Sequence, residues 1–214
     1  METVVPVAMV SDTASNAGVG RIGSPARRDP DTMEYRAMPF VDPSVVRCLK
    51  PAPGHVVMMC GMAGSGKTTY AKALEANGFR RLSIDEYLWA HFGRFDVDYP
   101  ARHYAQLQWV AEHANARQLG RLLRKRAACV LDYSFWSRAQ RQRYRRFVTD
   151  AGGQVTLLYL QADPRVLRQR LRIRNRTREA NAAFAVEGDM LRRFIQGFEA
   201  PDPDENAIVV VQTA

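Results

Sequence analysis

The residues from Gly61 to Thr68 (GMAGSGKT) match the phosphate-binding pattern G-x-x-x-x-G-K-[ST] in full. Glycines allow the backbone to turn its N–H groups toward phosphate oxygens, and a helix that begins near Lys67 adds the positive end of its dipole. Lys67 supplies a point charge for the terminal phosphates, and the Thr68 hydroxyl is an oxygen ligand suited to Mg²⁺. The pattern therefore predicts a nucleoside triphosphate site, whose binding residues are Gly61, Met62, Ala63, Gly64, Ser65, Gly66, Lys67, Thr68 and Thr69.

Asp85 closes the segment Arg81–Asp85 (RLSID), which predicts a second strand. Ligands collect beyond the carboxyl ends of parallel strands, so Asp85 is expected to face the same crevice as the phosphate loop. A carboxylate there can accept the proton of a substrate hydroxyl and hold that hydroxyl in line with the terminal phosphate. The alternative is that Asp85 caps a helix starting at Glu86, and the two roles are compatible.

Asp132 closes a third predicted strand, Ala127–Asp132 (AACVLD). An acid at the end of such an apolar strand orders Mg²⁺ or its waters opposite Thr68. Substrate binding and a purely structural role remain alternatives for Asp132. Arg138, just inside the next predicted helix, is expected either to touch a phosphate or to pair with an acid.

A basic helix is predicted to begin at Asp163–Pro164, a capping residue followed by a proline at the first helical position. Arg170 and Arg174 are four residues apart and share one face of this helix. Phosphoryl transfer requires positive charge around the migrating group, so both are predicted to act in catalysis by binding phosphates. The segment Asn175–Ala183 that follows is expected to form either a lid that excludes water or a solvent-facing basic turn.

The other residues of this helix follow the same periodicity. Leu167 and Leu171 share a second face, which should be the buried one, whereas Arg168 and Arg172 are expected to be solvated.

These residues need a scaffold, and the chain supplies short apolar runs that alternate with helical patterns. Predicted strands are His55–Cys60, Arg81–Asp85, Ala127–Asp132, Gln154–Leu160 and Ala207–Val211. Predicted helices follow the phosphate loop and lie at about Pro100–Arg126, Ser137–Asp150, Asp163–Arg174 and Glu187–Phe198. Strand–helix alternation indicates an α/β fold with a parallel sheet covered by helices on both faces.

Length and composition fit one domain with an extension. The chain has 214 residues, 46% of them hydrophobic, and a net charge of +9. We predict one domain at 51–214 and an N-terminal extension at 1–50 that is mostly disordered or loosely docked. No run of 18 apolar residues is present, the first residues lack a basic signal region, and three widely spaced cysteines form no disulfide framework. A cytoplasmic protein without a membrane partner is therefore expected.

The positive charge is concentrated between Arg117 and Arg178, where sixteen arginines and one lysine face three acids. Such a block attracts the phosphates of a nucleotide, a phosphorylated substrate or a nucleic acid. The alternative is that most of these arginines cover the solvated faces of helices.

The motifs GMAGSGKTT, SID, VLDYSFWSRAQR, LLYLQADPRVLRQRLRIRN and FEAPDPDE occur in this order. In this order they resemble the small P-loop kinases over Gly54–Val211, in particular the group of polynucleotide kinase, zeta toxin and chloramphenicol phosphotransferase. The resemblance implies a three-layer P-loop NTPase fold with a five-stranded parallel sheet in the order 2-3-1-4-5. It also implies ATP and Mg²⁺ as cofactors, Asp85 as the base, Arg170 and Arg174 as lid arginines, and part of the adenine site at Phe198–Pro201.

The implied activity is transfer of the ATP γ-phosphate to a hydroxyl of a small molecule such as an antibiotic, a nucleoside or a sugar. Polynucleotide kinases carry a further arginine shortly after the catalytic aspartate, whereas Glu86–Trp89 follow Asp85 here. A polynucleotide 5′-hydroxyl is therefore an alternative acceptor that is not favoured, and an ATP-binding regulatory module or an ATPase is a third possibility. The aromatic residues after Asp85 are expected either to hold the acceptor or to belong to the core; they are Tyr87, Trp89, Phe92, Phe95 and Tyr99.

Overall fold

The sheet at the centre of the molecule has five parallel strands in the order β2-β3-β1-β4-β5, as predicted. The computed structural model describes residues 41–176, 186 and 188–213. The strands are β1 His55–Cys60, β2 Arg80–Ser83, β3 Cys129–Asp132, β4 Gln154–Ala162 and β5 Ile208–Gln212. The inner strands β1 and β3 are short apolar runs without regular polar alternation, because helices cover the sheet on both faces.

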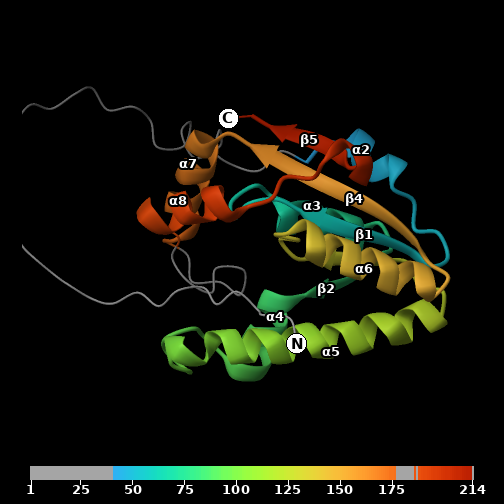
Figure 1. Cartoon of the computed structure of the whole chain (residues 1–214), viewed down its shortest axis with the longest axis horizontal. Helices are drawn as coiled ribbons and strands as arrows, with labels where there is room; N and C mark the ends of the chain where they lie inside the picture. Colours follow the sequence, from blue (N-terminus) through green and yellow to red (C-terminus); the bar gives the residue numbers. More distant parts are fainter. Residues whose placement is uncertain (1–40, 177–185, 187, 214) are drawn as a thin grey trace, which may run out of the picture.

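Helices connect the strands and cover both faces of the sheet (Figure 1). In chain order they are α2 Pro43–Cys48, α3 Lys67–Ala76, α4 Ile84–Phe92, α5 Tyr104–Arg124, α6 Arg138–Asp150, α7 Pro164–Arg174 and α8 Gly188–Gly197. Short 3-10 turns lie at Ala101–His103 and Pro203–Glu205. Helices α7 and α8 lie at the end of the sheet where its strands terminate (Figure 1).

The two faces of β1 belong to two separate cores. Val56, Met58 and Cys60 pack with residues of α4, α5 and α6 on one face. Val57 and Met59 pack with α3 on the other face, where α2 also contributes. All five side chains are at most 1% exposed, which fixes the strand and therefore the start of the loop that follows it.

The segment that precedes β1 contributes to the second core. Helix α2 was not predicted, because the extension was expected to be mostly disordered or loosely docked. This helix carries the apolar pair Val45–Val46. Both residues lie against this core, and the backbone N–H of Asp42 donates to the Tyr70 hydroxyl at 2.7 Å. The remainder of the predicted extension, residues 1–40, lies outside the described residues.

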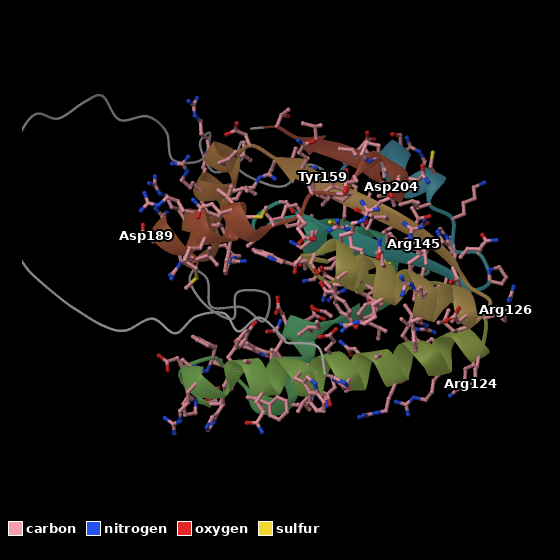
Figure 2. The ribbon with its side chains drawn as sticks, viewed as in Figure 1. Arg124, Arg126, Arg145, Tyr159, Asp189 and Asp204 are labelled. Atoms are coloured by element: carbon pink, nitrogen blue, oxygen red, sulfur yellow. The ribbon has the colours of Figure 1, made fainter. Side chains whose placement is uncertain are left out.

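A buried ion pair anchors the C-terminal segment to α6. Arg141 is 1% exposed, and its Nε and Nη2 each donate to a carboxylate oxygen of Glu205 at 2.7 Å. Its Nη1 donates to the carbonyls of Phe135 at 3.1 Å and Glu199 at 2.7 Å. Arg145, labelled in Figure 2, donates to the Glu205 carbonyl at 2.9 Å. Removing either partner alone would cost about 3–5 kcal/mol, because the other charge would be left buried without compensation.

Several element boundaries differ from the prediction by a few residues. Strand β2 ends at Ser83, and α4 begins at Ile84, so the SID motif spans a strand end and a helix start. The helix predicted from Pro100 is a 3-10 turn followed by α5 from Tyr104. Strand β4 continues two residues beyond Leu160, because β5 pairs with it as far as Ala162.

Among the residues that the structure describes, none of the helices combines the length and the apolar character needed to cross a bilayer.

Candidate active site

The phosphate loop joins β1 to α3, as its sequence pattern requires. Gly66 is the N-cap of α3 with φ of +96°, a left-handed conformation that favours glycine. A Cβ atom at Gly61 would stand 2.6 Å from the Leu160 carbonyl oxygen. Substituting either glycine would therefore distort the loop, because Gly61 has no room for a side chain and Gly66 has a backbone that others avoid.

The loop also holds polar groups suited to an anion. Ser65 is buried, and its Oγ makes no hydrogen bond. Lys67 lies in the first turn of α3, and its Nζ donates to the Met62 carbonyl at 2.8 Å across the loop. The first N–H groups of a helix have no partner within it, so they are donors as well. An unpaired buried hydroxyl, a lysine turned into the loop and free helical N–H groups together fit a triphosphate.

Asp132 lies beside this loop at the end of β3. The Thr68 hydroxyl donates to Oδ1 of Asp132 at 3.2 Å, which brings together the two residues predicted as Mg²⁺ ligands. Arg81 donates to Oδ2 of the same carboxylate at 2.7 Å. Within the described residues no group of three or more His, Cys, Asp and Glu side chains gathers as a metal site. A hydroxyl and one carboxylate still suit Mg²⁺, which usually keeps several waters and binds through one or two carboxylates.

Asp85 lies in the first turn of α4 rather than at its cap. Ser83 is the N-cap, and its hydroxyl accepts a hydrogen bond from the Glu86 N–H at 3.3 Å. The capping alternative for Asp85 is therefore wrong, because the strand ends two residues earlier than the sequence suggested. Ser83 pairs with Asp132 in the sheet, which sets the start of α4 beside the end of β3.

The pKa of Asp85 reflects its burial and the charged groups near it. Burial raises the pKa of this carboxyl to about 6, and the negative charge of Asp132 raises it as well. The positive charges of Lys67 and Arg174 act in the opposite direction. Burial lowers the pKa of Lys67, while Asp132 and Asp85 both oppose that shift. The two carboxylates, the loop lysine and Arg174 therefore form one electrostatic cluster.

The two predicted lid arginines have different surroundings. Burial lowers the pKa of Arg174, and the negative charge of Asp85 opposes this shift, so Arg174 belongs to the cluster. Arg170 is 5% exposed, and it donates to Gln212 Oε1 at 3.1 Å and to the Thr213 carbonyl at 3.3 Å, at the end of β5. The predicted lid, Asn175–Ala183, lies outside the described residues from position 177 onward.

The remaining features of α7 agree with the sequence analysis. Leu167 and Leu171 are each 1% exposed and form a small core with Leu191 of α8 and Met62 of the loop. Arg168 and Arg172 are exposed. The buried face of α7 therefore packs on the phosphate loop itself, which places Arg174 close to it.

Arg138 pairs with acids, one of the two roles expected for it. It forms ion pairs with Asp202, at 2.5 Å, and with Asp204 in the segment after α8. Its backbone N–H donates to Glu199 Oε2 at 2.6 Å. These contacts fix the segment that the kinase resemblance assigned to adenine.

The Phe198–Pro201 segment also has an aromatic neighbourhood. Phe198 stacks on Tyr159 of β4, labelled in Figure 2, with ring centroids 5.9 Å apart. Trp136 packs against Phe198 edge-on at 5.8 Å, and the Glu199 N–H donates to the Trp136 carbonyl at 3.2 Å. Flat apolar rings beside a fixed backbone are suited to a purine base.

The aromatic residues after Asp85 divide into two groups. Phe95 packs edge-on against Tyr99 at 6.1 Å and against Tyr104 at 5.4 Å. Burial raises the pKa of both tyrosines, and the charge of Asp85 raises it further, so these phenols belong to the surroundings of Asp85. Tyr87 instead stacks on His91 at 3.8 Å, one turn along α4.

Sequence reasoning missed two residues of this neighbourhood, Arg81 and Tyr104. Arg81 shares a strand face with Ser83 by the two-residue period, which was the available signal. Which face of β2 lies toward the phosphate loop depends on its pairing with β3, and this pairing could not be read from the sequence. Tyr104 was hidden in the helical pattern from Pro100.

Comparison with known proteins agrees with this fold. The chain matches the family model described as an AAA domain over residues 56–201, and it belongs to that family. Its fold is that of the small P-loop kinases, as the resemblance implied. No curated protein matches the sequence significantly.

Three solved structures are similar to this one. A kinase candidate from Chloroflexus aurantiacus has a TM-score of 0.58 and 18% identity, over 73% of this chain and 86% of that one. A sugar kinase from Janibacter has a TM-score of 0.50 and 20% identity, over 73% and 84%. A gluconokinase from Sinorhizobium meliloti has a TM-score of 0.51 and 20% identity, over 76% and 84%. At these identities the likeness establishes the fold.

Proposed function

We propose that the protein is an ATP-dependent kinase that transfers the γ-phosphate to a hydroxyl group of a small molecule. The observation that carries this proposal is the 3.2 Å contact of Thr68 with Asp132 beside the phosphate loop, with Asp85 in the helical turn that follows the paired residue Ser83. The mutual effects of these two acids, Lys67 and Arg174 on their pKa values agree with this arrangement. A protein that only binds nucleotide has no need of a carboxylate such as Asp85 beside the loop. Two similar structures are described as a sugar kinase and a gluconokinase, which supports a small hydroxylated acceptor.

In the proposed reaction Asp85 orients the acceptor hydroxyl and receives its proton. The hydroxyl oxygen forms a bond to the γ-phosphorus as the bond to the β–γ bridging oxygen breaks, and ADP leaves. Lys67 and Arg174 offset the charge on the transferred group. Thr68 and Asp132 would hold Mg²⁺, which supplies further positive charge to the phosphates when bound. Because Arg170 is directed to the end of β5, we assign it to holding α7, and through it Arg174, in place.

The test is a radiolabelled γ-phosphate transfer screen against hydroxylated small molecules and oligonucleotides. We expect wild-type protein to label one class of small molecule, and D85N to bind ATP with unchanged affinity but transfer nothing. The matched control is D150N, which changes an exposed aspartate at the end of α6. Full transfer by D85N would remove Asp85 as the base, and ATP binding without any transfer would favour a regulatory module or an ATPase.

A polynucleotide 5′-hydroxyl is the second candidate acceptor, because the arginine-rich block favours nucleic acid. Part of this block lies far from the site, since Arg124 and Arg126 lie at the end of the molecule opposite α7 and α8 (Figure 2). Oligonucleotide labelling that weakens steeply with salt would favour this candidate, and a flat salt dependence would remove it.

A further inference from the structure

Arg81 contacts three carboxylates on three different elements, and none of the proposed chemistry has used it. Its Nε donates to Glu75 Oε2 of α3 at 3.2 Å, and its Nη1 donates to Asp132 Oδ2 of β3 at 2.7 Å. Its Nη2 donates to Glu86 Oε1 in the first turn of α4. The side chains of Arg81 and Asp132 are only 5% and 3% exposed, so the contact between them forms away from bulk water and is weakly screened. Glu75 and Glu86 are 51% and 39% exposed, so their contacts with Arg81 are more open to solvent.

The two carboxylate oxygens of Asp132 have different hydrogen-bond partners. Oδ2 is occupied by Arg81, while Oδ1 faces the Thr68 hydroxyl at 3.2 Å. The Asp132 side chain is 3% exposed, so its orientation depends on these protein contacts rather than on water. A planar guanidinium fixes direction as well as charge, which an ammonium group does not.

The third contact, with Glu86, ties Arg81 to the helix that carries Asp85. Glu86 follows Asp85 in the chain, so the Arg81–Glu86 pair ties the first turn of α4 to β2. Arg81 therefore joins the helical turn that carries Asp85, the proposed base, to Asp132, the proposed metal ligand.

We propose that Arg81 is a positioning residue that holds Asp132 with Oδ1 toward Thr68, and so sets the affinity of the site for Mg²⁺ with nucleotide. This inference rests on the proposed function. Removal of a partner that orients a metal ligand typically costs about 10-fold to 100-fold in metal affinity or activity. A residue that served stability alone would change nucleotide binding equally with and without Mg²⁺.

The experiment measures ATP affinity by calorimetry with and without Mg²⁺, for wild type, R81M and R81K. The gain in affinity on adding Mg²⁺ is the readout. We expect R81M to reduce that gain by at least about tenfold and to leave the metal-free affinity nearly unchanged. The matched control is E75Q, which removes a half-exposed partner of Arg81 but keeps the Arg81–Asp132 contact, and it should retain the wild-type gain.

An undiminished gain in R81M, or an equal loss with and without Mg²⁺, would overturn the inference. R81M leaves a buried carboxylate without its partner, so thermal melting accompanies the measurement. If R81M does not fold, R81K decides, because one ammonium cannot reproduce the guanidinium contacts; an undiminished gain in R81K would also overturn the inference. A wild-type protein that gains nothing from Mg²⁺ would contradict the proposed function itself, independently of Arg81.

Discussion

The Thr68 hydroxyl donates a 3.2 Å hydrogen bond to Oδ1 of Asp132, which joins the start of α3 to the end of β3. These residues are 64 positions apart in sequence, and the parallel pairing of β1 with β3 brings them together. The pairing of Ser83 with Asp132 then sets α4 at the same edge of the sheet. The phosphate loop, the metal-site acid and Asp85 thus depend on the register of three adjacent strands.

Lys67 provides the most direct test of the loop. K67A removes a charge proposed to stabilise the transferred phosphoryl group, so we expect turnover to fall by at least about 10²–10³-fold. In the structure, Lys67 donates a hydrogen bond to the Met62 carbonyl, and losing one such bond costs only about 1 kcal/mol. The protein should therefore remain folded, as circular dichroism melting will show.

The matched control for K67A is K72A, which changes an exposed lysine of the same helix and should keep wild-type turnover. Equal effects of the two substitutions would contradict a role for Lys67 at the phosphates.

Asp85 should control the pH dependence of transfer. Its pKa is raised to about 6, and a base must be deprotonated to receive a proton. Turnover should therefore fall as the pH decreases through about 6, with one proton taken up. Turnover measured between pH 4.5 and 8 with the acceptor found in the screen tests this; a constant rate down to pH 5 would contradict it.

The same shift predicts a stability change in D85N. The folded pKa of about 6 lies above the ordinary value of 3.8, so the folded state binds the Asp85 proton more tightly than the unfolded state. The contribution of Asp85 to stability is therefore present below about pH 4 and is lost as the pH rises through 6. D85N, which stays neutral, should gain roughly 2–3 kcal/mol over wild type at pH 7 and little at pH 4. Denaturant unfolding at both pH values provides the measurement.

Local pattern predicted the strands, the phosphate loop and the two acids, whereas the order of the strands followed from the resemblance to the small P-loop kinases. The buried run of β1 and the caps of α6 and α7 are short-range features that tertiary contacts did not override. The contacts of Arg81 with Asp132 and of Arg170 with Gln212 could not be predicted, because these partners lie 51 and 42 positions away in sequence. The helical periodicity put Arg170 and Arg174 on one face, but it could not show that β5 would cover the first of them.

Because Arg170 and Arg174 have different surroundings, we expect substitution of one to change stability and of the other to change turnover. R174M removes a cation from the cluster around Asp85, so turnover should fall by about 10²–10³-fold with little change in melting temperature. R170M removes a buried guanidinium that bonds to Gln212 and Thr213, so it should lower the free energy of unfolding by about 1–3 kcal/mol.

Any loss of turnover in R170M should be caused by the weaker attachment of α7 to the end of β5. It should therefore recover in part at lower temperature, whereas the loss in R174M should not. The control is R172M, an exposed arginine between the two, which should behave as wild type in both assays. If R170M abolished transfer while melting as wild type does, Arg170 would act on the phosphates directly, and its contacts with β5 would have to open during turnover.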